Sequence, residues 1–192
     1  MKHNKIALAA ALVLGLGAAG SASADQGLIT FVGSVSDGTC VVSGGTGTNG
    51  GVGNFTVPID PVLSTDFTRA NQPLGLTQFN INISKDGNGA PCSGLQNGNA
   101  EFGFVTSSPN VNVAGRLKNV TTAAQGGATN VELQLLDDTG TAINLSQPKT
   151  WTVTGLDTQA ATLTYGVEYY STNANVGAGG VRSDVIYNVT YN

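Results

Sequence analysis

Apolar and polar residues alternate with period two in most hydrophobic segments of this chain. Such alternation predicts β-strands with one buried face, because successive side chains of a strand point to opposite sides. The segments, given by the residues on their inner face, are Ile29/Phe31/Gly33/Val35, Phe79/Ile81/Ile83, Phe102/Phe104, Val131/Leu133/Leu135, Trp151/Val153, Leu163/Tyr165/Val167/Tyr169 and Val185/Tyr187/Val189/Tyr191. After residue 24, no segment sustains a 3.6-residue apolar period over three turns. The sequence therefore predicts an all-β fold.

Short segments rich in Gly, Asn and Thr separate these predicted strands. Residues 44–51, 85–89 and 126–127 are clusters of this kind, and residues 137–140 (Asp-Asp-Thr-Gly) predict a hairpin turn. Residues 86–89 lack the Gly and Glu positions of a calcium-binding loop, so a turn is the better interpretation. The chain contains 27 Gly among 192 residues, about twice the usual share of roughly 7%. Many short strands joined by turns indicate a single-domain sandwich.

The N-terminal segment has the pattern of a secretory signal peptide. A basic stretch at residues 2–5 precedes an apolar run of 14 residues, 6–19, and residues 22–24 (Ala-Ser-Ala) form a small-x-small cleavage site. The run is shorter than the roughly 20 residues that a membrane-spanning helix needs. We therefore expect residues 1–24 to be removed on export, and we expect no stable membrane insertion.

Composition excludes several classes of enzyme and of binding protein. The only His lies in the predicted signal peptide, so the mature chain has no Ser-His-Asp or Cys-His constellation and no His-ligated metal site. It keeps six basic and twelve acidic residues, and the scattered cations argue against nucleic-acid binding. The sequence therefore indicates no catalytic residue, no metal site and no cofactor.

Cys40 and Cys92 are the two cysteines of the chain. In an exported protein such a pair is most often a structural disulfide. A redox or metal-binding pair would need C-x-x-C spacing or His partners, and neither is present. We therefore expect a disulfide, which closes a 52-residue loop and stabilises the fold by roughly 4 kcal/mol on the chain-entropy model.

The two ends of the mature chain carry the most informative motifs. Residues 31–35 (Phe-Val-Gly-Ser-Val) alternate, contain a Gly and end five residues before Cys40. At the other end, Gly179 is fourteenth from the C-terminus, Tyr191 is penultimate, and residues 169–172 read Tyr-Tyr-Ser-Thr. Taken together, these motifs resemble those of the chaperone–usher fimbrial subunits of the type 1 pilin family. The resemblance covers essentially the whole mature chain.

The resemblance implies an incomplete immunoglobulin-like sandwich that lacks its last strand. Residues 25–36 would be an N-terminal donor-strand extension, and residues 37–192 the pilin domain. The inward-facing residues of the donor strand would be Ile29, Phe31, Gly33 and Val35. The acceptor edge, which is also the chaperone-binding strand, would include Gly179, Val185, Tyr187, Val189 and Tyr191. Gly33 is expected where the groove is shallow, with a β-bulge as the alternative interpretation.

The resemblance also implies a structural function, as a shaft subunit of a surface fimbria that polymerises by donor-strand exchange and supports cell adhesion. Expected partners are neighbouring subunits in a homopolymer, a periplasmic chaperone and an outer-membrane usher, with export through the periplasm to the cell surface. A minor adaptor or tip-proximal adhesive subunit is the alternative. A tip adhesin with a separate receptor domain is disfavoured, because only about three residues separate the cleavage site from the alternating strand of the extension. A secreted hydrolase that uses two carboxylates has no support beyond the twelve acidic residues.

Overall fold

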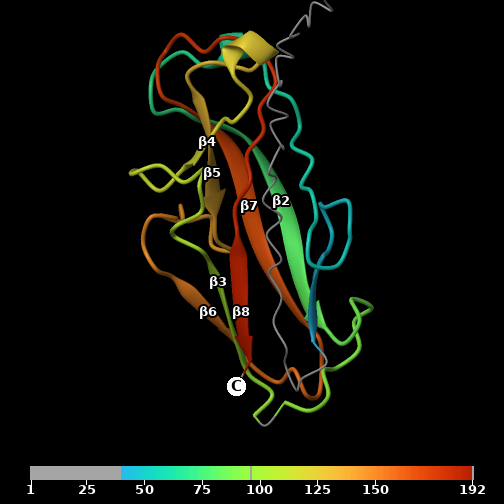
Figure 1. Cartoon of the computed structure of the whole chain (residues 1–192). Helices are drawn as coiled ribbons and strands as arrows, with labels where there is room; N and C mark the ends of the chain where they lie inside the picture. The colour runs from blue at the N-terminus through green and yellow to red at the C-terminus, as the bar shows by residue number, and fades with distance from the viewer. Residues whose placement is uncertain (1–39, 96, 192) are drawn as a thin grey trace, which may run out of the picture. The chain divides into compact units, whose positions relative to one another are not determined.

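The computed structural model describes residues 40–95 and 97–191, which form two antiparallel β-sheets (Figure 1). The five-stranded sheet has the order β1-β2-β7-β5-β4. Its strands are β1 (Val41–Gly44), β2 (Pro73–Ser84), β4 (Leu117–Lys118), β5 (Val131–Leu136) and β7 (Ala161–Ser171). The three-stranded sheet has the order β6-β3-β8 and consists of β3 (Ala100–Phe104), β6 (Thr150–Val153) and β8 (Tyr187–Tyr191). The predicted all-β class is confirmed.

Two short 3-10 helices, η1 (Ser64–Asp66) and η2 (Ala123–Gln125), lie in connections between strands. In the described part of the chain, no helix has the length and apolar character needed to cross a membrane.

The inner faces of the two sheets meet in one core. The ring of Tyr165 in β7 lies 5.9 Å, between centroids, from the rings of both Phe79 in β2 and Phe102 in β3. Ile81 and Ile83 of β2 are almost completely buried as well, while Asn82 between them keeps a partly exposed side chain. The period-two pattern of the sequence therefore corresponds to the inward faces of the strands.

β2 and β7 are longer than the predicted strands, at 12 and 11 residues. Their pairing shifts between Leu74 and Thr77, and Gly75 at this bulge has a φ of +70°. Glycine adopts such backbone angles without steric cost, so the strand can bend and continue. The apolar alternation in the sequence begins at Phe79, and the bulge allows β2 to start earlier, at Pro73.

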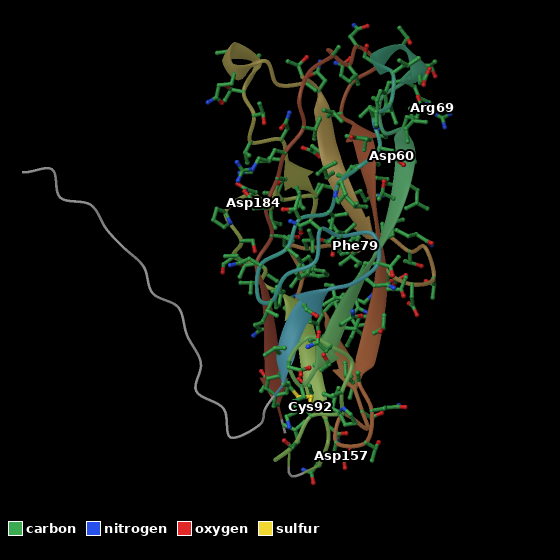
Figure 2. All side chains as sticks on the ribbon, turned by 90° about the vertical axis from the view of Figure 1, so that its right-hand side faces the viewer. Asp60, Arg69, Phe79, Cys92, Asp157 and Asp184 are labelled. Carbon is green, nitrogen blue, oxygen red and sulfur yellow. A yellow bond between two sulfur atoms is a disulfide. The ribbon has the colours of Figure 1, made fainter. Side chains whose placement is uncertain are left out.

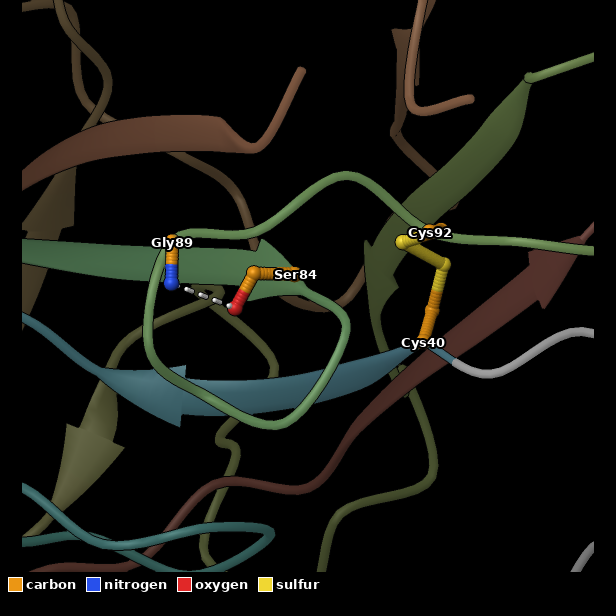
Figure 3. Close-up of a disulfide and its surroundings, with 4 residues drawn as sticks. All are labelled: Cys40, Ser84, Gly89 and Cys92. Carbon is orange, nitrogen blue, oxygen red and sulfur yellow. Dashed lines mark hydrogen bonds between the residues drawn. A yellow bond between two sulfur atoms is a disulfide. The ribbon is translucent and has the colours of Figure 1, made fainter. Parts of the chain in front are cut away.

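The predicted disulfide is present. Cys40, directly before β1, is bonded to Cys92 in the loop that follows β2, with a Cα–Cα distance of 5.2 Å (Figure 3). In the same loop, the Gly89 amide donates a hydrogen bond of 3.4 Å to Ser84 Oγ (Figure 3). The disulfide therefore ties the start of the domain to the connection between β2 and β3.

Candidate functional site

The C-terminal segment, residues 181–191, alternates strictly between half-buried and exposed side chains. The half-buried residues are Val181, Ser183, Val185, Tyr187, Val189 and Tyr191. The exposed residues are Arg182, Asp184, Ile186, Asn188 and Thr190. Ladder pairing with β3 begins only at Tyr187. Val185, which the sequence predicts to lie in the strand, is therefore just outside β8 although it keeps the strand's alternation.

The exposed residues direct their backbone N–H and C=O groups toward β3 and the segment that follows it. The Ile186 carbonyl accepts a hydrogen bond of 2.8 Å from the Val105 amide. Side chains take the place of ladder bonds before β8, because Ser108 Oγ accepts from the Ile186 amide and Asn119 Oδ1 from the Arg182 amide, both at 3.0 Å. The Arg182 carbonyl accepts a further hydrogen bond of 2.8 Å from the Val120 amide, so this edge of the C-terminal segment is bonded at Arg182, at Ile186 and along β8.

The half-buried residues direct their backbone groups to the opposite edge. In an antiparallel strand, the N–H and C=O groups of successive residues point alternately to the two sides. Because Ile186 bonds toward β3, its neighbours Val185 and Tyr187 face away from β3. Within residues 40–95 and 97–191, the half-buried residues of this segment form no backbone hydrogen bond on that side. The described domain therefore presents an unpaired strand edge.

A groove of about 760 Å³ follows this edge. Its second wall is the segment 53–59, in which Phe55, Val57 and Ile59 are half-buried. The apolar floor of the groove consists of Phe79, Leu117, Leu133, Leu135, Val167 and Tyr169. Figure 2 shows Phe79 lower in the molecule than both Asp184 and Asp60. The groove therefore reaches the inner face of the five-stranded sheet.

One contact spans the groove at the level of Tyr187. The Tyr187 hydroxyl donates a hydrogen bond to the Gly53 carbonyl. The Tyr187 ring lies between Phe55, at 6.1 Å, and Phe102, at 5.5 Å between centroids. Burial raises the pKa of Tyr187, so the hydroxyl keeps its proton at neutral pH and acts as a donor. The Tyr187 side chain therefore occupies the groove at this level.

A smaller cavity of about 120 Å³ adjoins the groove at Val181 and is lined by Gly179. A Cβ atom on Gly179 would lie 2.4 Å from the Ala128 nitrogen and 2.4 Å from the Gly127 carbonyl carbon. These distances are too short for any side chain without movement of the backbone. Glycine at this position therefore lets the C-terminal segment pass close to the loop after η2.

The predicted acceptor residues lie along this one edge. Val185 and Tyr187 line the groove, Gly179 lines the adjoining cavity, and Val189 and Tyr191 continue the edge within β8. The predicted donor-strand residues lie outside the described residues; they are Ile29, Phe31, Gly33 and Val35.

The second wall of the groove was not predicted from the sequence. Phe55, Val57 and Ile59 do alternate with polar residues or Pro, which is a strand-like signal. Pro58 and Pro61 mask that signal, because Pro within an apolar run argues against a strand that is paired on both sides. A segment that belongs to neither sheet tolerates Pro, and residues 53–59 are such a segment in the described domain, with backbone hydrogen bonds only at Gly53 and Thr56.

The groove has the features that an extended peptide segment requires. Such a segment can add to the unpaired edge through backbone hydrogen bonds and can fill the space over an apolar floor with alternate side chains. Among residues 40–95 and 97–191, no three His, Cys, Asp or Glu side chains gather closely enough to hold a metal ion.

Two fimbrial proteins are similar to the chain along nearly its whole length. An F17 fimbrial protein of Escherichia coli is 36% identical over 188 residues, which cover 93% of the chain and 96% of the relative. The major fimbrial subunit SMF-1 of Stenotrophomonas maltophilia (strain K279a) is 36% identical over 180 residues, which cover 90% of the chain and 96% of the relative. No protein-family model matches the chain.

Solved structures share the fold at lower identity. The P pilus rod subunit PapA superposes with a TM-score of 0.52 at 19% identity, over 80% of the chain and 99% of PapA. A subunit from a chaperone–usher pilus structure, described for the uncoiling of its rod, gives a TM-score of 0.52 at 18% identity, over 88% of the chain and 96% of the neighbour.

Proposed function

Because the chain belongs to the fimbrial subunits and has the fold of chaperone–usher pilus subunits, we propose that its groove is the site at which one subunit accepts a strand from the next. The protein is a structural subunit of a surface fimbria and associates with other subunits of the same fibre. The proposal concerns how that association is made.

One observation carries the proposal, namely the unpaired edge of residues 181–191 beside an apolar groove. An exposed edge of this kind is a template for strand addition or for aggregation. Covering this edge stabilises the protein and prevents aggregation. A strand that runs between the two walls of the groove would cover it. Such a strand would complete the three-stranded sheet beyond β8 and would separate the core from water.

The donated strand is the N-terminal extension, residues 25–36, of a neighbouring subunit. Three of its inward side chains, Ile29, Phe31 and Val35, are large and apolar. Burying each would contribute on the order of 1.5–3 kcal/mol, so the three together supply roughly 5–9 kcal/mol before backbone hydrogen bonds are counted. Head-to-tail repetition of this contact does not close, so it produces a filament.

Export precedes assembly in this account. Residues 1–24 direct the chain out of the cytoplasm and are then removed. In the periplasm a chaperone covers the open edge until an outer-membrane usher presents the next subunit. The edge needs this temporary cover because, as described above, its backbone groups are unpaired within the pilin domain.

A shaft subunit is the function best supported, because one relative of 36% identity is named a major fimbrial subunit. Immunogold labelling of this subunit on filaments tests that part of the proposal. Label along the whole length is expected for a shaft subunit. Label confined to one end would instead indicate an adaptor or a tip-proximal adhesive subunit.

The strand-exchange proposal is tested by separating the two roles of one chain. A mature subunit without residues 25–36 should still be captured by its chaperone and accept a strand, and it should not polymerise alone. A synthetic peptide of residues 27–36 should bind this subunit and raise its melting temperature. Phe31→Asp in the peptide should abolish most of the effect, because an unpaired carboxylate in an apolar groove is costly.

Val32→Asp is the matched control, since residue 32 should face away from the groove and tolerate the charge. Equal binding of the Phe31→Asp and Val32→Asp peptides would contradict the donor-strand assignment. So would polymerisation of the shortened subunit alone.

A further inference from the structure

Three Asn-Gly pairs occur in the chain, at residues 49–50, 88–89 and 97–98. An Asn followed by Gly loses ammonia more readily than other Asn, because glycine has no side chain to hinder attack of its backbone nitrogen on the Asn side chain. All three Asn side chains are exposed. Sequence and exposure therefore do not distinguish the three sites, and any difference between them comes from the groups that hold the reacting atoms.

Both reacting groups of the first pair are held by hydrogen bonds. The Thr56 amide donates to Asn49 Oδ1 at 2.6 Å, and the Gly50 amide donates to Thr48 Oγ1 at 3.0 Å. The Gly50 nitrogen can attack Asn49 Cγ only after both bonds break. Two such bonds, each of ordinary strength, slow the reaction about tenfold or more.

The third pair is held by burial. Gly98 is buried, and its carbonyl accepts a hydrogen bond of 2.8 Å from the Leu156 amide. The Asp157 side chain lies against the Gly98 α-carbon, where a Cβ atom would collide with Asp157 Oδ1. The attacking nitrogen must first lose its proton, and burial opposes formation of the resulting anion. Asn97 is therefore protected as well.

Nothing comparable holds the second pair. Within residues 40–95 and 97–191, the Asn88 side-chain amide forms no hydrogen bond. Gly89 is exposed, and its amide donates to Ser84 Oγ at 3.4 Å (Figure 3). This distance is longer than the usual range of about 2.7–3.2 Å, so the bond is weak. A Cβ atom on Gly89 would meet no atom within 4 Å, and water therefore reaches this pair freely.

We propose that Asn88 is a site of spontaneous deamidation in the fimbrial subunit. Hydroxide removes the proton of the Gly89 amide, and the nitrogen attacks Asn88 Cγ. The bond from Cγ to Nδ2 breaks, ammonia leaves with a proton taken from water, and a succinimide ring remains. Water then opens the ring at either carbonyl, which gives aspartate or isoaspartate at residue 88. Overall, one water molecule is consumed and one ammonia is released, with no oxidation or reduction.

The modification changes the charge of the subunit without touching the groove. The new carboxylate adds to the twelve acidic side chains of the chain. It lies two residues from Asp86, whose Oδ1 accepts a hydrogen bond of 3.1 Å from the Asn88 backbone amide. None of residues 85–89 is among the described residues that line the groove. A fimbria on the cell surface therefore becomes more acidic as it ages, while its subunits keep the groove unchanged.

Isotope labelling of assembled filaments tests the site. Filaments of the mature chain are incubated at mildly alkaline pH in water enriched in heavy oxygen, and fragmentation mass spectrometry then locates the label. Because the new carboxylate takes an oxygen from water, residue 88 should acquire label about tenfold or more faster than residue 49, and faster than residue 97. Equal labelling at the three residues, or an unlabelled residue 88, would overturn the proposal.

Unfolded chains provide the control for sequence effects. In urea with the disulfide reduced, the three sites should acquire label at similar rates, since no partner holds the reacting groups there. If residue 88 kept the same lead in urea as in filaments, the local sequence rather than the fold would set the order, and the structural assignment would be wrong.

Two substitutions complete the test. Asn88→Gln keeps the amide but lengthens the side chain, so ring closure is less favourable and the acidic species seen on isoelectric focusing of aged filaments should largely disappear. An undiminished acidic species would place the main site elsewhere and contradict the proposal. Thr48→Val removes the acceptor of the Gly50 amide and should speed labelling at residue 49 severalfold, with residue 88 unchanged. No change at residue 49 would show that hydrogen bonds do not set the order of the sites.

Discussion

The closed half of the sandwich, around Phe102, differs from the groove half, around Phe55. Phe102 is fully buried, and its ring lies 5.4–6.4 Å from four aromatic neighbours: Phe104, Trp151, Tyr165 and Tyr187. Phe55 is half-buried on a wall that belongs to neither sheet of the described domain. Both halves carry inward-facing apolar residues. The apolar residues of the groove half can pack against one further strand, which the described residues do not supply.

The largest effect is expected from one substitution made in each half. Phe102→Ala should lower the free energy of unfolding by about 3–5 kcal/mol, because it leaves a cavity in a closed core. Phe55→Ala should lower the free energy of unfolding clearly less than Phe102→Ala while the groove is empty. The loss caused by Phe55→Ala should grow once a donor peptide fills the groove. Urea unfolding of the mature subunit with and without the peptide of residues 27–36 measures both. If the cost of Phe55→Ala did not change on adding the peptide, the two halves would not differ as described.

Removing the disulfide is the next largest change. Cys40→Ser should lower the free energy of unfolding by about 2–5 kcal/mol, and Cys92→Ser should do the same. The subunit should be most vulnerable before it receives a strand, so export yield should fall before filament architecture changes. Periplasmic immunoblots and the melting temperature check this. Normal levels of Cys40→Ser with a normal melting transition would contradict it.

A smaller loss of stability is expected from a substitution at Gly179, where the groove half contacts the loop after η2. Gly179→Ala should lower the free energy of unfolding by about 1–3 kcal/mol, because the added methyl group overlaps the Gly127–Ala128 backbone. Gly180→Ala is the control, since a Cβ there meets no atom closer than 3.9 Å. Thermal melts of the two variants should differ clearly. Equal melting temperatures would show that the close approach at Gly179 is not a constraint.

The smallest effect is expected from Asp137, in the hairpin turn after β5. Hydrogen bonds from the Thr139 hydroxyl and then from Lys149 lower the pKa of Asp137. Because the folded pKa lies below the unfolded one, the stabilisation is present above the usual pKa of about 3.9 and is lost as the pH falls through the folded value.

Asp137→Asn should therefore lower the melting temperature slightly at pH 7, with a difference that shrinks below about pH 4. Lys149 contacts the Trp151 ring beside Phe102, so this substitution probes the closed half, and binding of the donor peptide should not change. A pH-independent difference would contradict the assigned role of the carboxylate.

Sequence patterns predicted the closed half better than the groove half. In β2, β3, β5, β6 and β7, apolar residues on the inner face alternate with more exposed residues along at least part of the strand, so the period is visible in the sequence. β1 and β4 were not predicted, because they are four and two residues long and are held by their neighbours rather than by an apolar pattern of their own. Tertiary pairing decides such short strands.

The candidate site was predicted in part. Val185, Tyr187, Val189 and Tyr191 show their common face through alternation. Gly179 was singled out by its place in a family motif, while its physical role depends on the loop that packs against it. Ser183 gave no signal at all, because a serine in an alternating strand reads as a solvent-facing residue until the structure shows which face it occupies.

Amide hydrogen exchange along residues 181–191, before and after filament assembly, tests the central claim most directly. Before assembly, the amides of Ser183, Val185, Tyr187 and Val189 should exchange rapidly, while those of Ile186 and Asn188, which bond on the β3 side, should be protected. Assembly should slow the first group strongly and leave the second nearly unchanged. If the amides of Ser183 to Val189 exchanged equally fast in subunits and in filaments, no strand would pair with this edge, and the proposed mode of assembly would be wrong.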